Sequence, residues 1–447
     1  MKITKNWTYR IASRYLAVWA GAVYLQAPAQ EAQHTPRFDF KGKMLVVACD
    51  TDMLASAYLD GQLGPPVGPD VLSVVRLDQT SARMRVSTVE VTNSVTGPPA
   101  AVAVTPDGRY AIVVETQGPR PANQPEATMK ELAPGKKITV VDLLNPDKPK
   151  AVQQIESYER AVSVSVNTAG SLVAVAFAAR THVKEPPLVI YQFHDGRLSA
   201  PTEPPIPGFH ADDALIDAEF LPNRNVLGLV YTTVSHPRLS LLNYAAQNNQ
   251  ITLDPWGNAV DLDRSPFLVK FTADGRFALV NSMYGSNVRG TLTSIQMAGS
   301  VDSHSEPQHI IVSHTEAGEL PEGLAISPNG RWVATANLER SYYPWTDPHQ
   351  KFFASLSLLH LDPATGVLQR VGEFPFDGVL PEPIVFDNSS RFLAAGSFEQ
   401  FGDPKAGGSI NFWRIVDNND EPGRVELVKL NDSVPVARGP QSMAIVR

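Results

Sequence analysis

The sequence repeats one short pattern seven times: an apolar run, a tight polar turn and a second apolar run. The clearest copy is AVAVTPDGRYAIVVE at residues 101–115. Five further copies begin at Val162, Asp217, Phe267, Gly323 and Pro383. The seventh copy is divided between the ends of the chain, because GPQSMAIVR ends at Arg447 and the run that would complete it, FDFKGKMLVVACD, begins at Phe38. A repeat divided in this way predicts a closed ring.

Each copy predicts a β-hairpin. Alternation such as Val102 and Val104 has the period of two expected of strands. The connecting Pro106 to Arg109 places proline and glycine where a short antiparallel turn needs them. The copies lie about 58 residues apart on average, which suits a four-stranded propeller blade with long loops. Aligned on the first apolar residue after the turn, they fall at Met44, Tyr110, Leu172, Val226, Phe277, Trp332 and Phe392.

Two further strand-like runs lie between successive hairpins, for example Lys137 to Asp142 and Ala151 to Ile155. The predicted fold is therefore all-β: a seven-bladed β-propeller of four-stranded antiparallel blades, closed by pairing of the C-terminal strand with the N-terminal strands. A β-sandwich or two stacked domains is the alternative. Ring closure favours the propeller, since it leaves no exposed sheet edges in the ring.

The N-terminus differs from the rest of the chain. Residues 1–14 carry four basic and no acidic residues, residues 15–25 are apolar, and Ala27-Pro28-Ala29 offers small residues for a signal peptidase. This pattern predicts a signal peptide over 1–29, a linker over 30–37 and the propeller over 38–447, in a periplasmic or secreted protein. An organelle presequence or a helix packed on the propeller would also fit. The apolar run is too short for a stable membrane span, which needs about 20 residues.

Charge and motifs narrow the range of functions. The formal net charge is -8 and Lys/Arg runs are missing, which argues against nucleic acid as a partner. The sequence contains no HExxH, paired CxxC, P-loop or GxSxG motif. We therefore expect no metal and no cofactor. The single Cys49 lies in an apolar run and is expected to be a buried small hydrophobe.

The hairpins TPDGRYAIVV, TADGRFALVN and SPNGRWVATAN resemble the repeats of seven-bladed lactonase-like propellers. This group includes 6-phosphogluconolactonase-like enzymes, carboxymuconate cyclases and YVTN-repeat surface and periplasmic proteins. The resemblance covers nearly the whole chain after residue 37. It implies the propeller architecture strongly and the activity weakly, because one fold carries many functions. Histidines that such enzymes often carry before the innermost strand have one counterpart nearby, His210.

The candidate site lies where the chain enters each innermost strand. Two Leu-Pro-Glu triplets place Glu322 and Glu382 at equivalent positions of adjacent blades, where repulsion would raise one pKa and create an acid/base pair. His210 is the candidate base beside them. The alternative is an internal salt-bridge ring that ties the blades together. The residues at this offset are Pro99, Arg160, Asp213, Ser265, Glu322, Glu382 and Gln441.

Further binding residues are expected on the same face. Arg160 and Arg264 could hold an anionic substrate. The long loops of blades five to seven are rich in aromatic residues, which either line a pocket or cover loop backbone. The predicted binding residues from these loops are Tyr284, Arg340 and Tyr342. Asp213 and Gln441, at the strand entries, are also predicted to bind the substrate.

Two functions remain open from the sequence. In the first, an exported enzyme acts on a small anionic lactone or cyclic carboxylate by acid/base catalysis at the channel mouth. In the second, a non-catalytic propeller binds a small ligand, a peptide or a protein partner.

Overall fold

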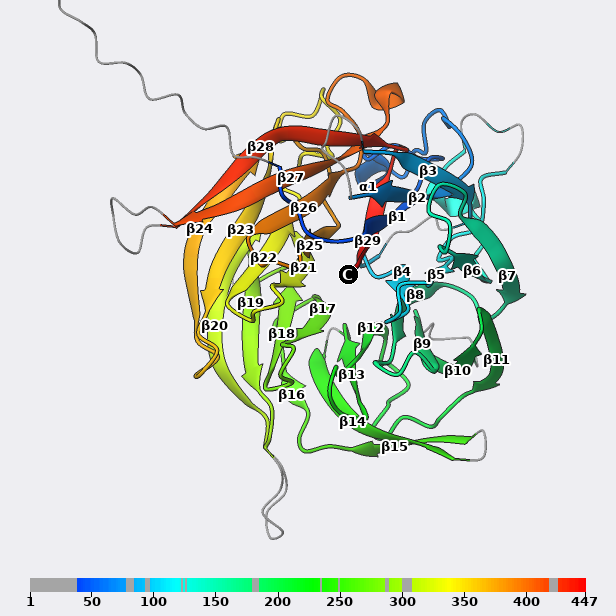
Figure 1. The fold of residues 1–447 in the computed structure, drawn as a ribbon, viewed down its shortest axis with the longest axis vertical. Coiled ribbons are helices and arrows are strands. Elements are labelled where there is room, and N and C mark those ends of the chain that lie inside the picture. Colours follow the sequence, from blue (N-terminus) through cyan, green and yellow to red (C-terminus); the bar gives the residue numbers. More distant parts are fainter. Residues whose placement is uncertain are drawn as a thin grey trace, which may run out of the picture. The chain divides into compact units, whose positions relative to one another are not determined.

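The computed structural model describes residues 38–77, 84–92, 97–121, 124, 127–178, 185–233, 235–247, 250–285, 289–299, 308–417 and 425–447. The predicted signal peptide and linker lie outside these residues. The described chain forms seven antiparallel sheets arranged as blades around a central axis, each with four main strands (Figure 1). The predicted seven-bladed propeller is confirmed.

Strands at equivalent positions of the blades form concentric layers. The innermost strands are β29 (Pro440–Val446), β4 (Val102–Val104), β8 (Ala161–Val166), β12 (Leu215–Phe220), β17 (Pro266–Phe271), β21 (Pro321–Ile326) and β25 (Ile384–Phe386). The second strands are β1 (Met44–Cys49), β5 (Tyr110–Val114), β9 (Leu172–Phe177), β13 (Val226–Tyr231), β18 (Phe277–Ser282), β22 (Trp332–Asn337) and β26 (Phe392–Ser397). All seven second strands begin at the residue that the repeat alignment predicts.

The outer layers complete the blades. The third strands are β2 (Val71–Arg76), β6 (Lys137–Asp142), β10 (Leu188–His194), β14 (Arg238–Gln247), β19 (Arg289–Gln296), β23 (Ala354–Leu361) and β27 (Gly408–Asp417). The fourth strands are β3 (Val86–Glu90), β7 (Lys150–Glu156), β11 (Arg197–Thr202), β15 (Gln250–Pro255), β20 (Ile310–Glu319), β24 (Leu368–Phe376) and β28 (Val425–Val436). Outside these layers lie β16 (Val260–Asp261), α1 (Ala57–Asp60), η2 (Met129–Glu131) and η3 (Pro404–Ala406).

The ring closes as the divided repeat predicts. β29 pairs antiparallel with β1, and Val46 lies opposite Ala444 at the middle of the pairing. The first blade therefore takes its innermost strand from the end of the chain and its other three from the start.

The hairpin turns share one local chemistry. In the second blade, the Thr105 hydroxyl accepts a hydrogen bond of 3.0 Å from the backbone N–H of Tyr110, and Gly108 has φ 71°. A left-handed backbone conformation at this position favours glycine, because a residue with a Cβ is strained there. Asn167, Thr272, Ser327 and Asp387 accept the equivalent bond in four other blades. The polar turns are thus a structural part of the repeat.

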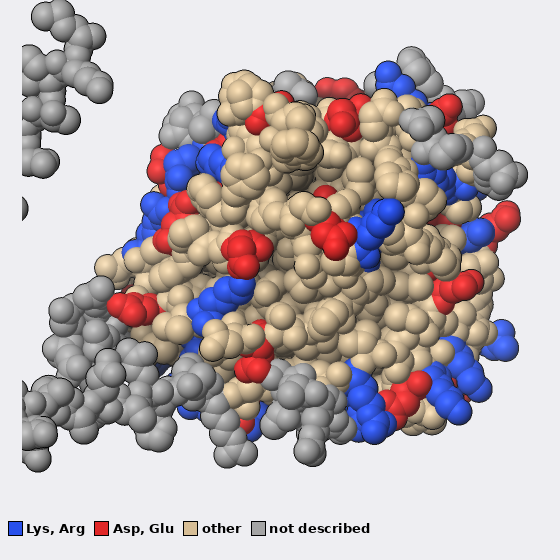
Figure 2. All heavy atoms as spheres, turned by 90° about the horizontal axis from the view of Figure 1, so that it is seen from above, with Lys and Arg blue, Asp and Glu red and all other residues tan. Residues whose placement is uncertain are grey.

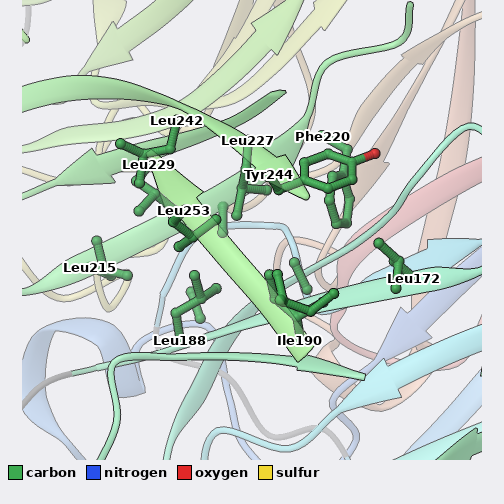
Figure 3. Close-up of a cluster of buried hydrophobic side chains, with 14 of the residues drawn as sticks. Leu172, Leu188, Ile190, Leu215, Phe220, Leu227, Leu229, Leu242, Tyr244 and Leu253 are labelled. Atoms are coloured by element: carbon green, nitrogen blue, oxygen red, sulfur yellow. The ribbon is translucent and has the colours of Figure 1, made fainter. Parts of the chain in front are cut away.

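The core lies between neighbouring blades. Figure 3 shows such a cluster between the third and fourth blades, where Ile190 and Leu188 of β10 face Leu229 and Leu242 across the interface. A polar contact adds to the packing. The buried carboxylate of Asp217 accepts from the Ser163 hydroxyl at 2.6 Å and from the Val269 N–H at 2.9 Å, so it links three innermost strands.

The surface carries both signs of charge. On the side seen in Figure 2, acidic and basic side chains are scattered among uncharged residues, with no continuous basic area. Within the described residues, no helix is long and apolar enough to span a membrane. Cys49 is fully buried, and burial raises the pKa of its thiol to about 12.

Candidate functional site

The predicted carboxyl pair forms at one end of the central channel. Glu322 is the second residue of β21, and Glu382 lies two residues before β25. Leu320 and Leu380, each two residues earlier, have φ 54° and 45°. The same left-handed turn therefore directs the chain into both strands, and equivalent positions of adjacent blades bring the two carboxyl groups together. Gly439, with φ 78°, stands at the corresponding position before Gln441 of the first blade.

Both glutamates are withdrawn from water. Glu322 is 5% exposed and Glu382 is fully buried. Burial raises the pKa of Glu322 to about 8. Burial and the neighbouring Glu322 raise the pKa of Glu382 well above its ordinary range. The pair therefore retains at least one proton at neutral pH, as expected for two carboxyl groups sharing one site.

The backbone around Glu322 is held by one side chain of the neighbouring blade. The Asn281 amide donates to the carbonyl oxygens of Pro321 and Glu322 at 2.6 and 3.0 Å. Its own carbonyl oxygen accepts from the Leu268 N–H at 2.9 Å. Asn281 is fully buried at the end of β18, so it fixes the entry to β21 against the fifth blade.

The pair is covered by two loop segments that the repeat pattern does not predict. Residues 53–63, which include α1, and residues 127–132 form what we call the cap. The two segments are joined by a hydrogen bond of 2.8 Å from the Met129 N–H to the Gly61 carbonyl. Apolar residues of the cap pack against Met283, Leu320, Leu338, Leu380 and Phe398 of the fifth, sixth and seventh blades. The cap belongs to loops of the first and second blades, so its contacts with the fifth and sixth blades carry it across the channel mouth.

The cap residue Tyr58 lies beside the carboxyl pair, because both glutamates act on its hydroxyl. Its ring lies 6.3 Å from that of Tyr342 and 6.4 Å from that of Phe398, both in edge-on contact. Burial, followed by the charges of Glu382 and Glu322, raises the pKa of its hydroxyl well above the ordinary range. A neutral phenol above two carboxyl groups can exchange protons or hydrogen bonds with them.

The predicted residues at the entries to the third, fourth and fifth blades lie in different surroundings. Both oxygens of the buried Asp213 accept from the Arg238 guanidinium, at 2.8 and 2.6 Å. Asp213 also accepts from the backbone N–H of His210 at 2.8 Å, and the His210 side chain is exposed. Arg264 is exposed, and Arg160 is half-buried with φ 60°. Asp213 is thus held by the protein itself, while His210 and Arg264 face solvent.

The aromatic loops contain a second charged cluster. Arg340 pairs with Glu319, and Lys351 bridges Glu319 and Glu339 with both contacts at 2.7 Å. Glu339 also accepts from the Ser355 hydroxyl at 2.9 Å. These contacts favour the interpretation of Arg340 as part of an internal ion-pair network.

The remaining predicted binding residues differ in exposure. The Tyr342 ring lies 5.0 Å from that of Tyr343, and burial raises the pKa of its hydroxyl. Tyr284 is 42% exposed, and Gln441 is fully buried in β29. Tyr342 reaches the carboxyl pair through its ring contact with Tyr58, and the charge of Glu322 acts on its hydroxyl.

Two cavities flank this region. One, of about 340 Å³, follows the channel and is lined by residues of all seven innermost strands or their entries, including Gly323 and Pro383, which directly follow the two glutamates. The Lys270 ammonium and the Glu219 carboxylate meet in it at 3.1 Å. The other, of about 620 Å³, lies beside the cap between loops of the first two blades, and Asp52, Asp70 and Arg120 border it.

Three buried acids, which the repeat pattern does not predict, lie together at the second cavity. One carboxylate oxygen from each of Asp50, Asp52 and Asp70 lies within 4.8 Å of those of the other two. A signal was present in the sequence: Asp50 directly follows the buried strand β1 and Asp70 directly precedes β2. The end of one strand and the start of its antiparallel partner meet at the same edge of the sheet.

Comparisons with known proteins support the architecture. A scan against protein-family models found no match, and a search of curated proteins found none either. A candidate 6-phosphogluconolactonase from Bacteroides fragilis superposes with a TM-score of 0.60 at 13% identity, over 91% of this chain and 98% of that one. A second, from Bacteroides uniformis, gives 0.60 at 14% identity over 91% and 100%. The periplasmic gluconolactonase of Pseudomonas aeruginosa gives 0.57 at 16% identity over 90% and 99%.

These identities are low, so the comparisons bear on the fold. The predicted resemblance to lactonase-like seven-bladed propellers is confirmed at that level.

Proposed function

We propose that the protein is an exported hydrolase of small anionic lactones, with Glu322 and Glu382 as its acid/base pair. The observation that carries this proposal is the meeting of two buried carboxyl groups, with at least one shared proton, at the channel mouth of a lactonase-like propeller. The solved structures with this fold include a periplasmic gluconolactonase, which supports both the substrate class and the location.

The proposed chemistry is ester hydrolysis of the ring. Water adds to the lactone carbonyl carbon, the bond from that carbon to the ring oxygen breaks, and a hydroxy acid forms. One glutamate, as the carboxylate, takes a proton from the attacking water. The other, as the carboxylic acid, gives a proton to the departing ring oxygen. Paired groups of this kind contribute about 10²- to 10⁴-fold to a rate.

Substrate entry requires movement of the cap. Tyr58 covers the pair, and displacement of residues 53–63 would open the mouth and rehydrate the carboxyl groups, so that one of them ionises. His210, Arg160 and Arg264 have the chemistry to carry protons to solvent and to attract an anion. We also propose that five further residues of the same face bind the substrate: Asp213, Gln441, Tyr284, Arg340 and Tyr342. All of these roles rest on the positions of the residues around that face.

The test is hydrolysis of a lactone panel that includes gluconolactone and 6-phosphogluconolactone. We expect Glu322→Gln and Glu382→Gln each to lower kcat by about 100-fold or more. Glu156→Gln, which changes an exposed carboxylate on the outer strand β7, should leave kcat unchanged. Circular dichroism would show that all three variants are folded.

Two results would overturn the proposal. One is a kcat that stays at the wild-type value in both Glu322→Gln and Glu382→Gln. The other is a wild type that hydrolyses none of the lactones, which would favour a non-catalytic propeller that binds a small ligand or a protein partner.

A further inference from the structure

We propose that Asp50, Asp52 and Asp70 form a binding site for a divalent cation of the calcium class at the base of the cap. The inference is independent of the proposed hydrolase activity, since it rests on other residues and its test does not measure turnover.

The fold creates the cluster from two strand ends. Asp50 and Asp52 follow β1, and Asp70 precedes its antiparallel partner β2. The three residues are 0%, 6% and 7% exposed, so their charges are largely removed from water. The cost of burying each anion adds to their mutual repulsion, and retained protons, the nearby charge of Arg438 or a bound cation can offset it.

Two carboxylate oxygens of the trio are free to bind a cation. Asp50 Oδ2 and Asp52 Oδ1 are buried and accept no hydrogen bond from any described residue. The oxygens on the other side of these carboxylates are fixed by backbone donors: Asp50 Oδ1 by the Asp52 N–H at 3.3 Å and Asp52 Oδ2 by the Arg120 N–H at 3.2 Å. The carboxylates are therefore held in place with one acceptor each left over, which is the arrangement a metal ion satisfies.

The nearby guanidinium groups of Arg438 and Arg120 donate to backbone carbonyl oxygens, and the charge of Arg438 also acts on Asp50 and Asp52. Arg438 donates to the carbonyl oxygens of Thr51 and Pro65, and among the described residues it makes no ion pair with the trio. Arg120 directs its guanidinium to the carbonyl oxygens of Asp52 and Gly64. Both arginines thus support the loop backbone around the trio.

The donor set indicates which cation would bind. All three side chains offer hard carboxylate oxygens, which suit calcium or magnesium better than transition metals. Calcium binds oxygens at about 2.3–2.6 Å, so two ligands on opposite sides are about 4.8 Å apart, and magnesium requires a tighter octahedron. The spacing of the trio allows one calcium ion to reach all three carboxylates.

The adjoining cavity provides the rest of the coordination. Asp52 and Asp70 both line the cavity of about 620 Å³, which supplies a route for the ion and room for water ligands. Asp52 directly precedes Met53, the first residue of the cap. A bound ion would therefore fix the start of the segment that carries Tyr58.

The experiment measures calcium binding to the full chain after treatment with EGTA and removal of the chelator. Isothermal titration with CaCl₂ should show about one ion per chain, and millimolar CaCl₂ should raise Tm by about 2 °C or more. The double variant Asp52→Asn/Asp70→Asn should bind at least 10-fold more weakly. Asp60→Asn, an exposed acid on α1 of the same loop, should bind like the wild type.

Two results would overturn the site. The first is a wild type that shows no heat of binding and no shift in Tm at CaCl₂ concentrations up to 10 mM. The second is a double variant that binds calcium as the wild type does, which would place the ion elsewhere. The titration of the wild type needs no variant to fold, and an equal response to MgCl₂ would refute the assignment to the calcium class.

Discussion

At the scale of single residues, the pair of Glu322 and Glu382 combines two opposing requirements. A carboxyl group that is buried with another cannot be fully ionised, and a proton is retained in place of a counterion. The alternative of an internal salt-bridge ring would need cations at the neighbouring offsets. Asp213 instead pairs with Arg238 of its own blade, and Arg264 is exposed. The two glutamates therefore have the environment of proton carriers.

This environment predicts a pH dependence of stability. An unfolded glutamate titrates near 4.5, and the pKa of Glu322 in the folded protein is about 8. Between these values the folded state binds more protons than the unfolded state. The contribution of Glu322 to the free energy of unfolding is therefore fully present below about pH 4.5 and is lost as the pH rises to 8. The free energy of unfolding should fall by up to about 1.4 kcal/mol per pH unit for each such proton.

Urea unfolding of wild type and Glu322→Gln at pH 5, 6, 7 and 8 checks this dependence. The variant should show a smaller decrease and exceed the wild type in stability at pH 8. Glu156→Gln should follow the wild type throughout. Parallel curves for wild type and Glu322→Gln would contradict a protonated Glu322 in the folded state.

At the scale of elements, the left-handed turns before the innermost strands position the site. Leu320 and Leu380 accept the strained conformation and are buried under the cap. Gly439 takes the same conformation before β29, and there the space is much tighter. A Cβ at Gly439 would lie 2.0 Å from the carbonyl oxygen of Asp50. The Asp50 N–H donates a hydrogen bond of 2.8 Å to the Gly439 carbonyl. This glycine is therefore required both by its φ and by the close approach of the closing strand.

Gly439→Ala should destabilise the protein by about 3 kcal/mol, because strain and a backbone clash add. Gly208→Ala is a matched control. Gly208 has φ 71°, like Gly439, but a Cβ there meets nothing within 4 Å, so it should cost only about 1 kcal/mol. Urea unfolding measures both. Equal losses would show that the contact with Asp50 contributes nothing.

The elements also show where sequence reasoning reached its limit. The hairpin repeat is local, so the start of every second strand could be read from turn residues such as Asp107 and Gly108. Equivalent offsets then placed Glu322 beside Glu382. The cap does not repeat, and Tyr58 of the first blade meets the glutamates of the sixth and seventh blades through packing over the channel mouth. No period in the sequence records such a contact, although the acids flanking β1 and β2 left a readable trace.

At the scale of the whole molecule, closure makes the ring one cooperative unit. β29 contributes the innermost strand of the first blade and also packs against β4 and β25 of the blades on either side. Without it, β1 becomes a sheet edge facing the channel, and the first and seventh blades lose their shared apolar packing, which includes Met443 and Phe412. The last strand therefore affects the stability of every blade, beyond its own hydrogen bonds.

A chain ending at Gly439, which lacks residues 440–447, should lose about 10 °C or more in Tm and aggregate at concentrations where the full chain stays soluble. The synthetic peptide PQSMAIVR, added in excess, should restore part of the Tm because it supplies β29 in trans. A peptide of the same composition in scrambled order should have no effect, since alternation and register decide the pairing with β1. An unchanged Tm in the shortened chain would show that the remaining blades are stable without closure, and that the divided repeat serves another purpose.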